Sequence, residues 1–376
     1  MKKNIAIVIT RLDLGGAQKV ALELADGLDK TKFNVHLICG AGGMLDSEAK
    51  RIKGINLFFM AELIHPIHIL FDLIAFARLK AYFEKNSIDI VHTHSSKAGL
   101  LGRLAAALAK NRPVVFHTVH GFPFHEYQNP FARFVYAQLE RFAARYTDRL
   151  IAVGGDVAAY GAANGVGLRE KYTVIRAAVD IKLFKRAKTN RGLYLASLGL
   201  APRVFTVGMI GNLKKQKNPR GFIETARLAL KSGVKLQFVF AGGGSQMEDI
   251  RELLAKYKMA DRVKFIGWIN EPEKFMKSID LFLLTSLWEG LPCTLVQAAA
   301  AGIPSVASNI GGNSEFIKLA SSGAVYPPLD YPAAAAEVLK AAGKKTKLRI
   351  KTGVLRQFDT AYMVKAHEKE YLKPVR

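Results

Sequence analysis

The chain reads TSLWEGLPCTLVQAAAAGIPSVASNIGGNSEFI from Thr285 to Ile317. The apolar run at 281–284 just before this stretch predicts a strand, and the small-residue pattern that ends at Ala301 predicts a helix. An acid and two residues that break regular structure stand between them: Glu289, Gly290 and Pro292. The order of strand, acidic loop and helix N-terminus is typical of a parallel α/β sheet.

In open parallel sheets, ligands bind beyond the carboxyl ends of the strands, where the next helix presents unpaired N–H groups and a positive dipole end. Gly290 allows a close backbone approach, and Pro292 suits the first turn of the helix. The Glu289 carboxylate can accept hydrogen bonds from hydroxyl groups, and the Gln297 amide can bond a second part of the same ligand. We therefore expect a ligand site here; an acid that merely caps an ordinary helix is the alternative.

Strand-like apolar runs alternate with helix-length segments along the whole chain, which indicates α/β organisation with parallel sheets. In the first half we expect strands at 5–9, 35–39, 88–92, 114–119 and 149–153, with helices at 17–28, 67–84, 99–109 and 131–146. In the second half we expect strands at 205–210, 237–241, 263–266, 281–285 and 305–307.

The length of 376 residues suits two domains. Residues 181–200 are charged and irregular and interrupt the strand–helix alternation, so we place the linker there. We expect one Rossmann-like domain over 1–186, a second Rossmann-like domain over 187–360, and a final helix over 361–376. Two such domains imply a cleft in which the carboxyl ends of the two sheets face each other.

Two further loops carry groups that suit an anion. Gly15 and Gly16 follow the first strand and open a helix, so their N–H groups can face a phosphate, although many α/β proteins simply turn there. The segment GNLKKQKNP at 211–219 places Lys214 and Lys217 just before a helix start. It is a candidate diphosphate clamp, and a solvated basic turn is the alternative.

Three motifs together resemble the donor-binding signature of retaining GT-B glycosyltransferases of the family 4 type. They are Glu289-Gly290-Leu291-Pro292, GIP at 302–304 and GGNSE at 311–315. The resemblance implies the GT-B fold, in which 1–186 is the acceptor-side domain and 187–360 is the nucleotide-sugar-binding domain. It also implies a Gly-Gly loop such as Gly15-Gly16 facing the cleft. It also implies that Glu289 lies by the donor sugar. The family has a second Glu for the ribose hydroxyls where this chain has Gln297, a neutral and weaker ligand.

The same resemblance gives roles to other loops of the second half. Asn212 stands where the family has an Arg, and Lys217 matches a family Lys. The missing Arg removes a bidentate phosphate donor, so Lys217 and Lys214 are expected to supply the neutralising charge. The loops at Gly243 and Ile269 resemble those that shape the nucleotide pocket, and main-chain groups near Ile269 are expected to bind the base.

In the first half, His120 sits where the family places a histidine near the donor sugar. A neutral imidazole there can bond a sugar hydroxyl, and its cation can balance charge on the leaving phosphate; a purely structural hydrogen bond is the alternative. His94 and Lys97 end another strand and are candidates for the acceptor side. In the family the terminal helix crosses back to the first domain, with Phe358 and Tyr362 as the expected anchors.

The formal net charge is +24, from 55 Lys and Arg against 31 Asp and Glu, and both halves are basic. This balance suits an anionic membrane surface, a diphosphate substrate or nucleic acid, or serves solubility alone. Residues 121–149 mix aromatic residues with arginines, and on one helix Arg141, Arg145 and Arg149 would form a membrane-facing stripe, unless the aromatics are core. No RNP-like or zinc-finger pattern supports nucleic acid as a partner.

Cys39 and Cys293 are the only cysteines, which argues against a disulfide framework or zinc site and suits a reducing cytoplasm. The N-terminus looks like a first strand rather than a signal peptide. The apolar segment at 63–77 is too short and too polar to span a bilayer. Glycosyltransferases of the other main fold hold a divalent cation with Asp-x-Asp, which this chain lacks, so we expect neither metal nor cofactor.

The expected function is that of a retaining glycosyltransferase acting in cell-envelope polysaccharide synthesis, peripheral on the inner face of the cell membrane. It would move a hexosyl or N-acetylhexosaminyl group from a UDP-sugar to a saccharide or lipid-linked saccharide. A sugar-nucleotide epimerase or a phosphorylase on the same scaffold is the alternative enzyme. A basic nucleic-acid-binding protein is the alternative from another class.

Overall fold

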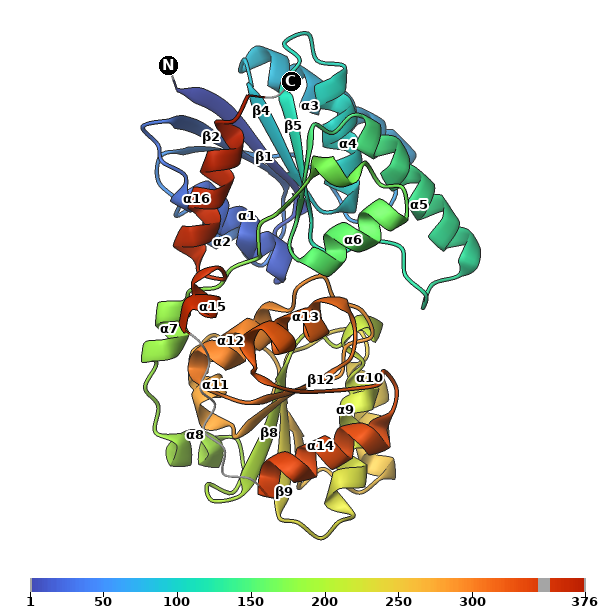
Figure 1. Ribbon diagram of the computed structural model, residues 1–376, viewed down its shortest axis with the longest axis vertical. Helices are drawn as coiled ribbons and strands as arrows, with labels where there is room; N and C mark the ends of the chain where they lie inside the picture. The colour runs from blue at the N-terminus through green and yellow to red at the C-terminus, as the bar shows by residue number, and fades with distance from the viewer. Residues whose placement is uncertain (1, 344–351, 375–376) are drawn as a thin grey trace. The chain divides into compact units, whose positions relative to one another are not determined.

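The structure of the chain is a computed structural model that describes residues 2–343 and 352–374 (Figure 1). It divides into two compact units. The first unit consists of Met1–Ala178 and Thr360–Arg376, and the second of Val179–Asp359. The chain therefore leaves the first unit, builds the second, and returns to the first for its last helix.

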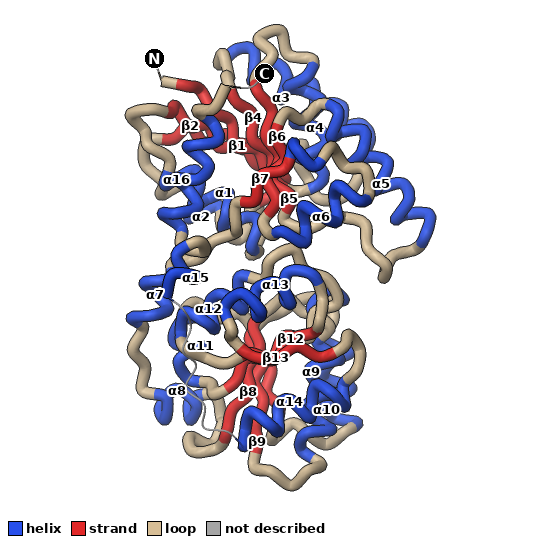
Figure 2. Tube along the Cα trace, viewed as in Figure 1, coloured by secondary structure: helices blue, strands red, loops and turns tan. Residues whose placement is uncertain are grey.

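The first unit is built on a seven-stranded parallel sheet in the order β3-β2-β1-β4-β5-β6-β7 (Figure 2). The strands are β1 (Lys3–Arg11), β2 (Phe33–Gly40), β3 (Ile55–Phe59), β4 (Ile90–His94), β5 (Val114–Val119), β6 (Arg149–Ala152) and β7 (Tyr172–Val174). In the register, Ile5 of β1 lies opposite Val35 of β2 and Ile90 of β4. The run from Ile5 to Ile9 is fully buried, as expected for a central strand covered on both faces.

Helices cover this sheet on both sides (Figure 2). They are α1 (Gly16–Gly27), α2 (Asp46–Ala49), α3 (Ile69–Lys85), α4 (Ser96–Ala107), α5 (Pro130–Arg145), α6 (Gly155–Ala163), the 3-10 turn η1 (Arg169–Lys171) and α16 (Thr360–Tyr371). α4 packs on β4 and β5 and is flanked by α3 and α5, whereas α16 packs against α1. α3, α4 and α5 therefore form one layer on this sheet.

The second unit has a six-stranded parallel sheet in the order β10-β9-β8-β11-β12-β13. Its strands are β8 (Phe205–Ile210), β9 (Leu236–Ala241), β10 (Val263–Phe265), β11 (Leu281–Leu284), β12 (Ser305–Ser308) and β13 (Gly323–Tyr326). Its helices are α7 (Ile181–Arg186), α8 (Arg191–Ser197), η2 (Lys215–Lys217), α9 (Pro219–Leu230), α10 (Met247–Lys256), α11 (Pro272–Ser278), α12 (Cys293–Ala301), α13 (Gly311–Ala320), α14 (Tyr331–Gly343) and α15 (Thr352–Arg356). The direction of strand order reverses between β8 and β11, which makes the gap between these strands the topological switch point.

Every strand expected from the sequence is present, and the fold class is confirmed. Three edge strands, β3, β7 and β13, were not expected, because edge strands are short and only partly buried, so their apolar pattern is weak. The expected irregular linker at 181–200 instead contains two short helices. Asp180 caps α7 by accepting from the N–H of Leu183, and Asn190 caps α8 by accepting from the N–H of Leu193.

The terminal helix α16 is anchored by residues other than those expected. Phe358 is buried but packs edge-on against Phe316 within the second unit, with ring centroids 5.1 Å apart. Tyr362 is 47% exposed. The anchor is Tyr371, whose buried ring packs edge-on against Phe116 of β5 at 5.1 Å. The expected pair was therefore wrong, because aromatic character alone does not say which side of a helix faces its domain.

Candidate functional site

Two loops at the carboxyl ends of β8 and β11 bring the main predicted residues together. Lys217 closes the 3-10 turn η2 after β8, and Glu289 lies in the loop after β11. The Lys217 ammonium forms an ion pair with Oε1 of Glu289. The two side chains are only 17% and 7% exposed, so water screens their attraction far less than at the open surface. The pair sits at the topological switch point, where open α/β sheets bind ligands.

The Glu289 carboxylate is held in place from several sides. The Ser286 hydroxyl donates to its Oε1 at 2.7 Å, and the amide of Gln216 lies 3.4 Å from its Oε2. The same amide donates to the carbonyl of Trp288 at 3.0 Å, and the N–H of Leu287 donates to the carbonyl of Gln216 at 2.7 Å. The two loops are thus bonded to each other along their length. Oε2 keeps room for a stronger donor, because 3.4 Å is a weak hydrogen bond.

A second set of contacts fixes the loop after β8. Asn218 adopts a left-handed conformation with φ 49° and caps α9 by accepting from the N–H of Gly221. The Thr285 hydroxyl at the end of β11 lies 3.0 Å and 2.9 Å from the carbonyls of Lys217 and Asn218. Lys217 therefore projects from a braced turn rather than from a loose basic loop.

Two helices begin beside the Glu289 loop without a side-chain cap. Pro292 occupies the N-cap of α12, one position before the first turn expected for it, and Ile310 precedes α13. No N-cap side chain bonds the first turn of either helix, and helix starts of this kind can bind an anion. A Cβ on Gly312 would lie 1.9 Å from the carbonyl oxygen of Gly290, so the first turn of α13 presses directly on the acidic loop. Only glycine allows this approach, which explains the second glycine of the GGNSE motif.

The other expected donor-binding residues are distributed around these loops. Asn212 and Lys214 lie between β8 and η2, and Leu291 is buried beside Pro292. Gln297 stands in the second turn of α12, half-buried, and its side chain makes no hydrogen bond to any residue that the structure describes. Its amide is free for a ligand.

Gly243 and Ile269 follow β9 and β10, and a hydrogen bond of 2.7 Å from the N–H of Gly242 to the carbonyl of Gly267 ties their loops together. Between them lies Trp268, 42% exposed, with its indole against Gly243. Trp268 is therefore a surface ring at the carboxyl edge of the sheet.

Histidines fill the interior of the first unit where β4 and β5 end. Nδ1 of His94 lies 2.9 Å from Nε2 of His120. Nδ1 of His92 lies 2.5 Å from the hydroxyl of Tyr371, and its Nε2 lies 2.7 Å from the hydroxyl of Thr118. α16 is therefore hydrogen-bonded into the centre of the sheet.

Burial keeps these histidines neutral. An imidazolium ion loses its hydration inside the protein, so desolvation lowers the pKa, and neighbouring histidines add repulsion. The pKa of His120 falls to about 3 and that of His367 on α16 to about 4. The pKa values of His92, His94 and His117 also fall well below the usual range.

Both expected acceptor-side residues have contacts that the sequence did not indicate. His94 is fully buried, so it can influence a substrate only through His120. The ammonium group of Lys97 is bonded within the protein. It pairs with Asp72 at 2.5 Å and donates to the carbonyls of Ile64 and Pro66. An ammonium group has three N–H donors, so none is left for an acceptor. None of the three partners of Lys97 could be foreseen, because all of them are distant from it in sequence.

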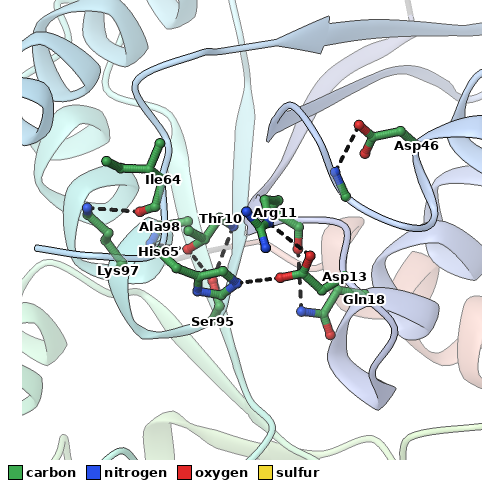
Figure 3. Close-up of polar contacts among 11 residues, drawn as sticks. Thr10, Arg11, Asp13, Gln18, Asp46, Ile64, His65, Ser95, Lys97 and Ala98 are labelled. Atoms are coloured by element: carbon green, nitrogen blue, oxygen red, sulfur yellow. Dashed lines mark hydrogen bonds and ion pairs between the residues drawn. The ribbon is translucent and has the colours of Figure 1, made fainter. Parts of the chain in front are cut away.

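Figure 3 shows polar residues at the carboxyl ends of β1 and β4 that the sequence analysis missed. The hydroxyls of Thr10 and Ser95 lie 2.8 Å apart, and His65 bonds Asp13 at 2.8 Å. Ser95, the N-cap of α4, has φ 63° and ψ 157°, a conformation that is almost exclusive to glycine. Gly15 is the uncapped N-cap of α1 in the same region. The signal in the sequence was a Ser-Ser pair directly after a strand.

Two family descriptions match the chain. "Glycosyltransferase Family 4" matches residues 14–183, and "Glycosyl transferases group 1" matches residues 193–353. Together they cover most of both units and leave out β1 and α16 of the first unit.

Individual proteins agree with the family descriptions. The chain is 34% identical to the UDP-Gal:alpha-D-GlcNAc-diphosphoundecaprenol alpha-1,3-galactosyltransferase of Escherichia coli, over 81% of this chain and 79% of that protein. It is 24% identical to the putative glycosyltransferase EpsF of Bacillus subtilis (strain 168), over 82% and 79%. Among solved structures, Anabaena Alr3699/HepE in complex with UDP-glucose superposes with a TM-score of 0.83 at 19% identity, over 98% of each chain.

The buried histidines predict that the first unit loses stability in mild acid. Their folded pKa values lie below the unfolded value of 6.5, so the unfolded state binds more protons below pH 6.5. Stability should be full above pH 6.5 and should fall toward pH 4, by up to about 1.4 kcal/mol per pH unit for each histidine. In His94→Asn, the amide can replace Nδ1 of His94. This variant should take up one proton fewer on unfolding in acid, so its unfolding free energy should depend less steeply on pH.

Hydrogen exchange of peptides from β4 and α16 between pH 7.5 and 5, corrected for the intrinsic exchange rate, measures this change. Equal opening free energies across that range would show that the histidines are already protonated in the native state.

Proposed function

The chain belongs to the glycosyltransferases, with a family 4 domain followed by a group 1 domain, and on that premise we propose that it builds cell-envelope polysaccharide by transferring a sugar from a nucleotide donor to a saccharide acceptor. Its fold is GT-B. The observation that carries the proposal is the Lys217–Glu289 pair between two loops at the carboxyl ends of β8 and β11.

We assign the donor to the second unit. Lys217 and Lys214 neutralise the diphosphate together with the uncapped starts of α12 and α13. Glu289 accepts hydrogen bonds from the sugar hydroxyls through its less engaged Oε2. The free amide of Gln297 bonds the ribose diol, and main-chain groups near Ile269 bind the base. Because an ammonium has three donors, Lys217 can keep Glu289 and reach a phosphate oxygen at once.

The donor we propose is a UDP-sugar carrying a hexosyl or N-acetylhexosaminyl group, and the acceptor is a saccharide on a lipid diphosphate. The support is the relative from Escherichia coli, whose name states UDP-Gal and GlcNAc-diphosphoundecaprenol. A neutral His120 contributes a hydrogen bond to a substrate hydroxyl rather than a positive charge, because its pKa is about 3.

Retention of the anomeric configuration follows if reaction occurs on one face of the sugar. The bond from the anomeric carbon to the diphosphate oxygen breaks, and the acceptor oxygen bonds to that carbon from the same side. The acceptor proton passes to the departing diphosphate, whose negative charge Lys217 and the helix starts stabilise. No side chain has to attack the sugar, and Glu289 acts by positioning it.

Lys217→Ala tests the donor site. Losing a charge-assisted hydrogen bond costs about 1.5–3 kcal/mol, so kcat/KM for the donor should fall about 10- to 150-fold. Lys231→Ala, an exposed lysine just after α9, is the matched control and should leave the kinetics unchanged. Initial rates with varied nucleotide sugar measure both variants. An unaltered donor KM and kcat in Lys217→Ala would remove this residue from the site.

We propose that the reaction needs no metal ion or other cofactor. The charge on the diphosphate is offset by lysines and helix starts, and the chain contains no Asp-x-Asp pair. Activity should persist undiminished in excess EDTA after extensive dialysis, because no step uses a cation. Strict loss of turnover in EDTA, with recovery on adding Mg²⁺ or Mn²⁺, would contradict this proposal.

We also propose that the enzyme binds peripherally to the inner face of the cell membrane. Among the residues that the structure describes, no helix is long and apolar enough to cross a membrane. In α5, however, the large apolar side chains face solvent. Small residues such as Ala137, Ala143 and Ala144 face the domain, while Phe131 and Phe134 are 76% and 60% exposed.

The first turns of α3 are similar, with Ile69 77% exposed and Leu70 and Leu73 also exposed. Outward apolar residues with exposed arginines such as Arg133 and Arg145 suit an anionic lipid surface. The expected arginine stripe was partly wrong, because Arg149 opens β6 and is not on the helix.

Vesicle flotation tests the membrane proposal. The chain should float with vesicles that contain phosphatidylglycerol and less with pure phosphatidylcholine. Phe131→Ser/Phe134→Ser should reduce flotation at least about tenfold, because two exposed rings lose their burial in the lipid. Leu193→Ser/Val234→Ser removes two exposed apolar residues of the second unit and should have no effect. Equal flotation of both double variants would rule out α5 as the attachment surface.

A further inference from the structure

A groove of about 800 Å³ lies on the first unit between the end of α5 and the segment from α6 to η1. α5 ends at Arg145, shortly before β6 begins at Arg149, and η1 directly precedes β7. The groove therefore lies at the amino edge of the sheet. The loops that carry His120 and Ser95 are at the carboxyl edge, so the groove is separate from the candidate site.

Four cations line this groove: Arg141, Arg145, Arg169 and Lys171. No carboxylate is among the lining residues, and none of the four forms an ion pair with any residue that the structure describes. Elsewhere on this basic chain, arginines such as Arg78 and Arg191 are paired with acids. The groove is thus a local concentration of uncompensated positive charge.

Two of the cations are fixed in position by main-chain carbonyls. Nε of Arg141 donates to the carbonyl of Asn164 at 2.7 Å, and Nζ of Lys171 donates to that of Thr147 at 2.8 Å. These bonds neutralise the ends of α6 and α5, which carry about half a negative charge each. Four full charges against about one leave roughly three positive charges facing the groove. Capping the helices therefore does not account for the whole cluster.

We propose that this groove binds the phosphate headgroup of an anionic membrane lipid. Charge complementarity favours a phosphate group as the ligand. The apolar residues at the edge of the groove indicate that this phosphate belongs to a lipid. Phe142 belongs to the outward apolar side of α5, and Leu168 opposite is 70% exposed. A headgroup in the groove can extend its chains along Phe142 toward Phe134. A volume of about 800 Å³ lies within the range of small-molecule sites. The choice of a lipid rests on the membrane attachment proposed above.

Calorimetry on the intact chain with dihexanoyl-phosphatidylglycerol below its micelle concentration tests the groove without a membrane. Arg145→Gln/Arg169→Gln removes two exposed cations that make no hydrogen bond to a described residue, so folding should be unaffected. The dissociation constant should rise about 10- to 30-fold. Lys231→Gln/Lys235→Gln, exposed lysines of the second unit, removes the same charge and should leave it unchanged.

Two further probes identify the ligand class. Dihexanoyl-phosphatidylcholine, in which choline offsets the phosphate, should bind at least tenfold more weakly, and so should inorganic phosphate, which lacks apolar chains. Inorganic phosphate binding as tightly as the anionic lipid would overturn the lipid assignment. Equal binding of the anionic lipid by the parent and the groove variant would overturn the site itself.

The outcomes separate this inference from the membrane proposal. Phe131→Ser/Phe134→Ser should lose vesicle flotation yet bind the soluble anionic lipid within about twofold of the parent, since both residues lie outside the groove lining. If the parent chain does not float but binds the soluble lipid in a groove-dependent manner, the membrane proposal fails and the phosphate site stands. If the parent chain floats but the groove variant binds the soluble lipid as tightly as the parent, the phosphate site fails and the membrane proposal stands.

Discussion

The ion pair between Lys217 and Glu289 is the contact on which the second unit's ligand site depends. It joins the loops after β8 and β11, and the hydroxyls of Ser286 and Thr285 hold each partner from its own side. A carboxylate and an ammonium that are this poorly exposed stabilise each other and stay in position without a ligand. A nucleotide-sugar donor bound there, as we propose, meets preformed charges rather than having to order them, which is what positioning and charge stabilisation in phosphate-leaving reactions require.

The sequence predicts the elements of the fold well, because buried parallel strands are continuous apolar runs whose carboxyl ends carry the polar loops. It also indicates that Lys217 and Glu289 lie in loops that follow strands, and the structure brings these two loops together because β8 and β11 are neighbours. It fails where distant segments decide. The roles of His94 and Lys97 depend on His120 and on the α3 region, and the strained φ of Ser95 depends on its three-dimensional setting, which no local pattern encodes.

The inward and outward sides of α5 show the same limit. Its aromatic residues repeat at helical spacing, which indicates one apolar stripe but not whether the stripe faces the sheet or the solvent. In the structure the alanines face inward and Glu140 pairs with Arg103 inside the domain, so the aromatic stripe is left outside. Small residues and an internal ion pair hold α5 on its domain, so its larger side chains are available to contact another surface. The positive charge of the groove at the end of α5 suits the anionic lipid surface that we propose.

The position of α16 in the first unit means that this unit can be completed only after the second unit has been synthesised. Its Tyr371 completes the interior around His92 and Phe116, yet it is added after the 181 residues from Val179 to Asp359. At about 5–20 residues per second, the ribosome needs roughly 10–40 s to make that insert. During this time α16 does not yet cover the part of the nascent sheet around His92 and Phe116. A premature stop near the end of the message therefore damages the segment translated first.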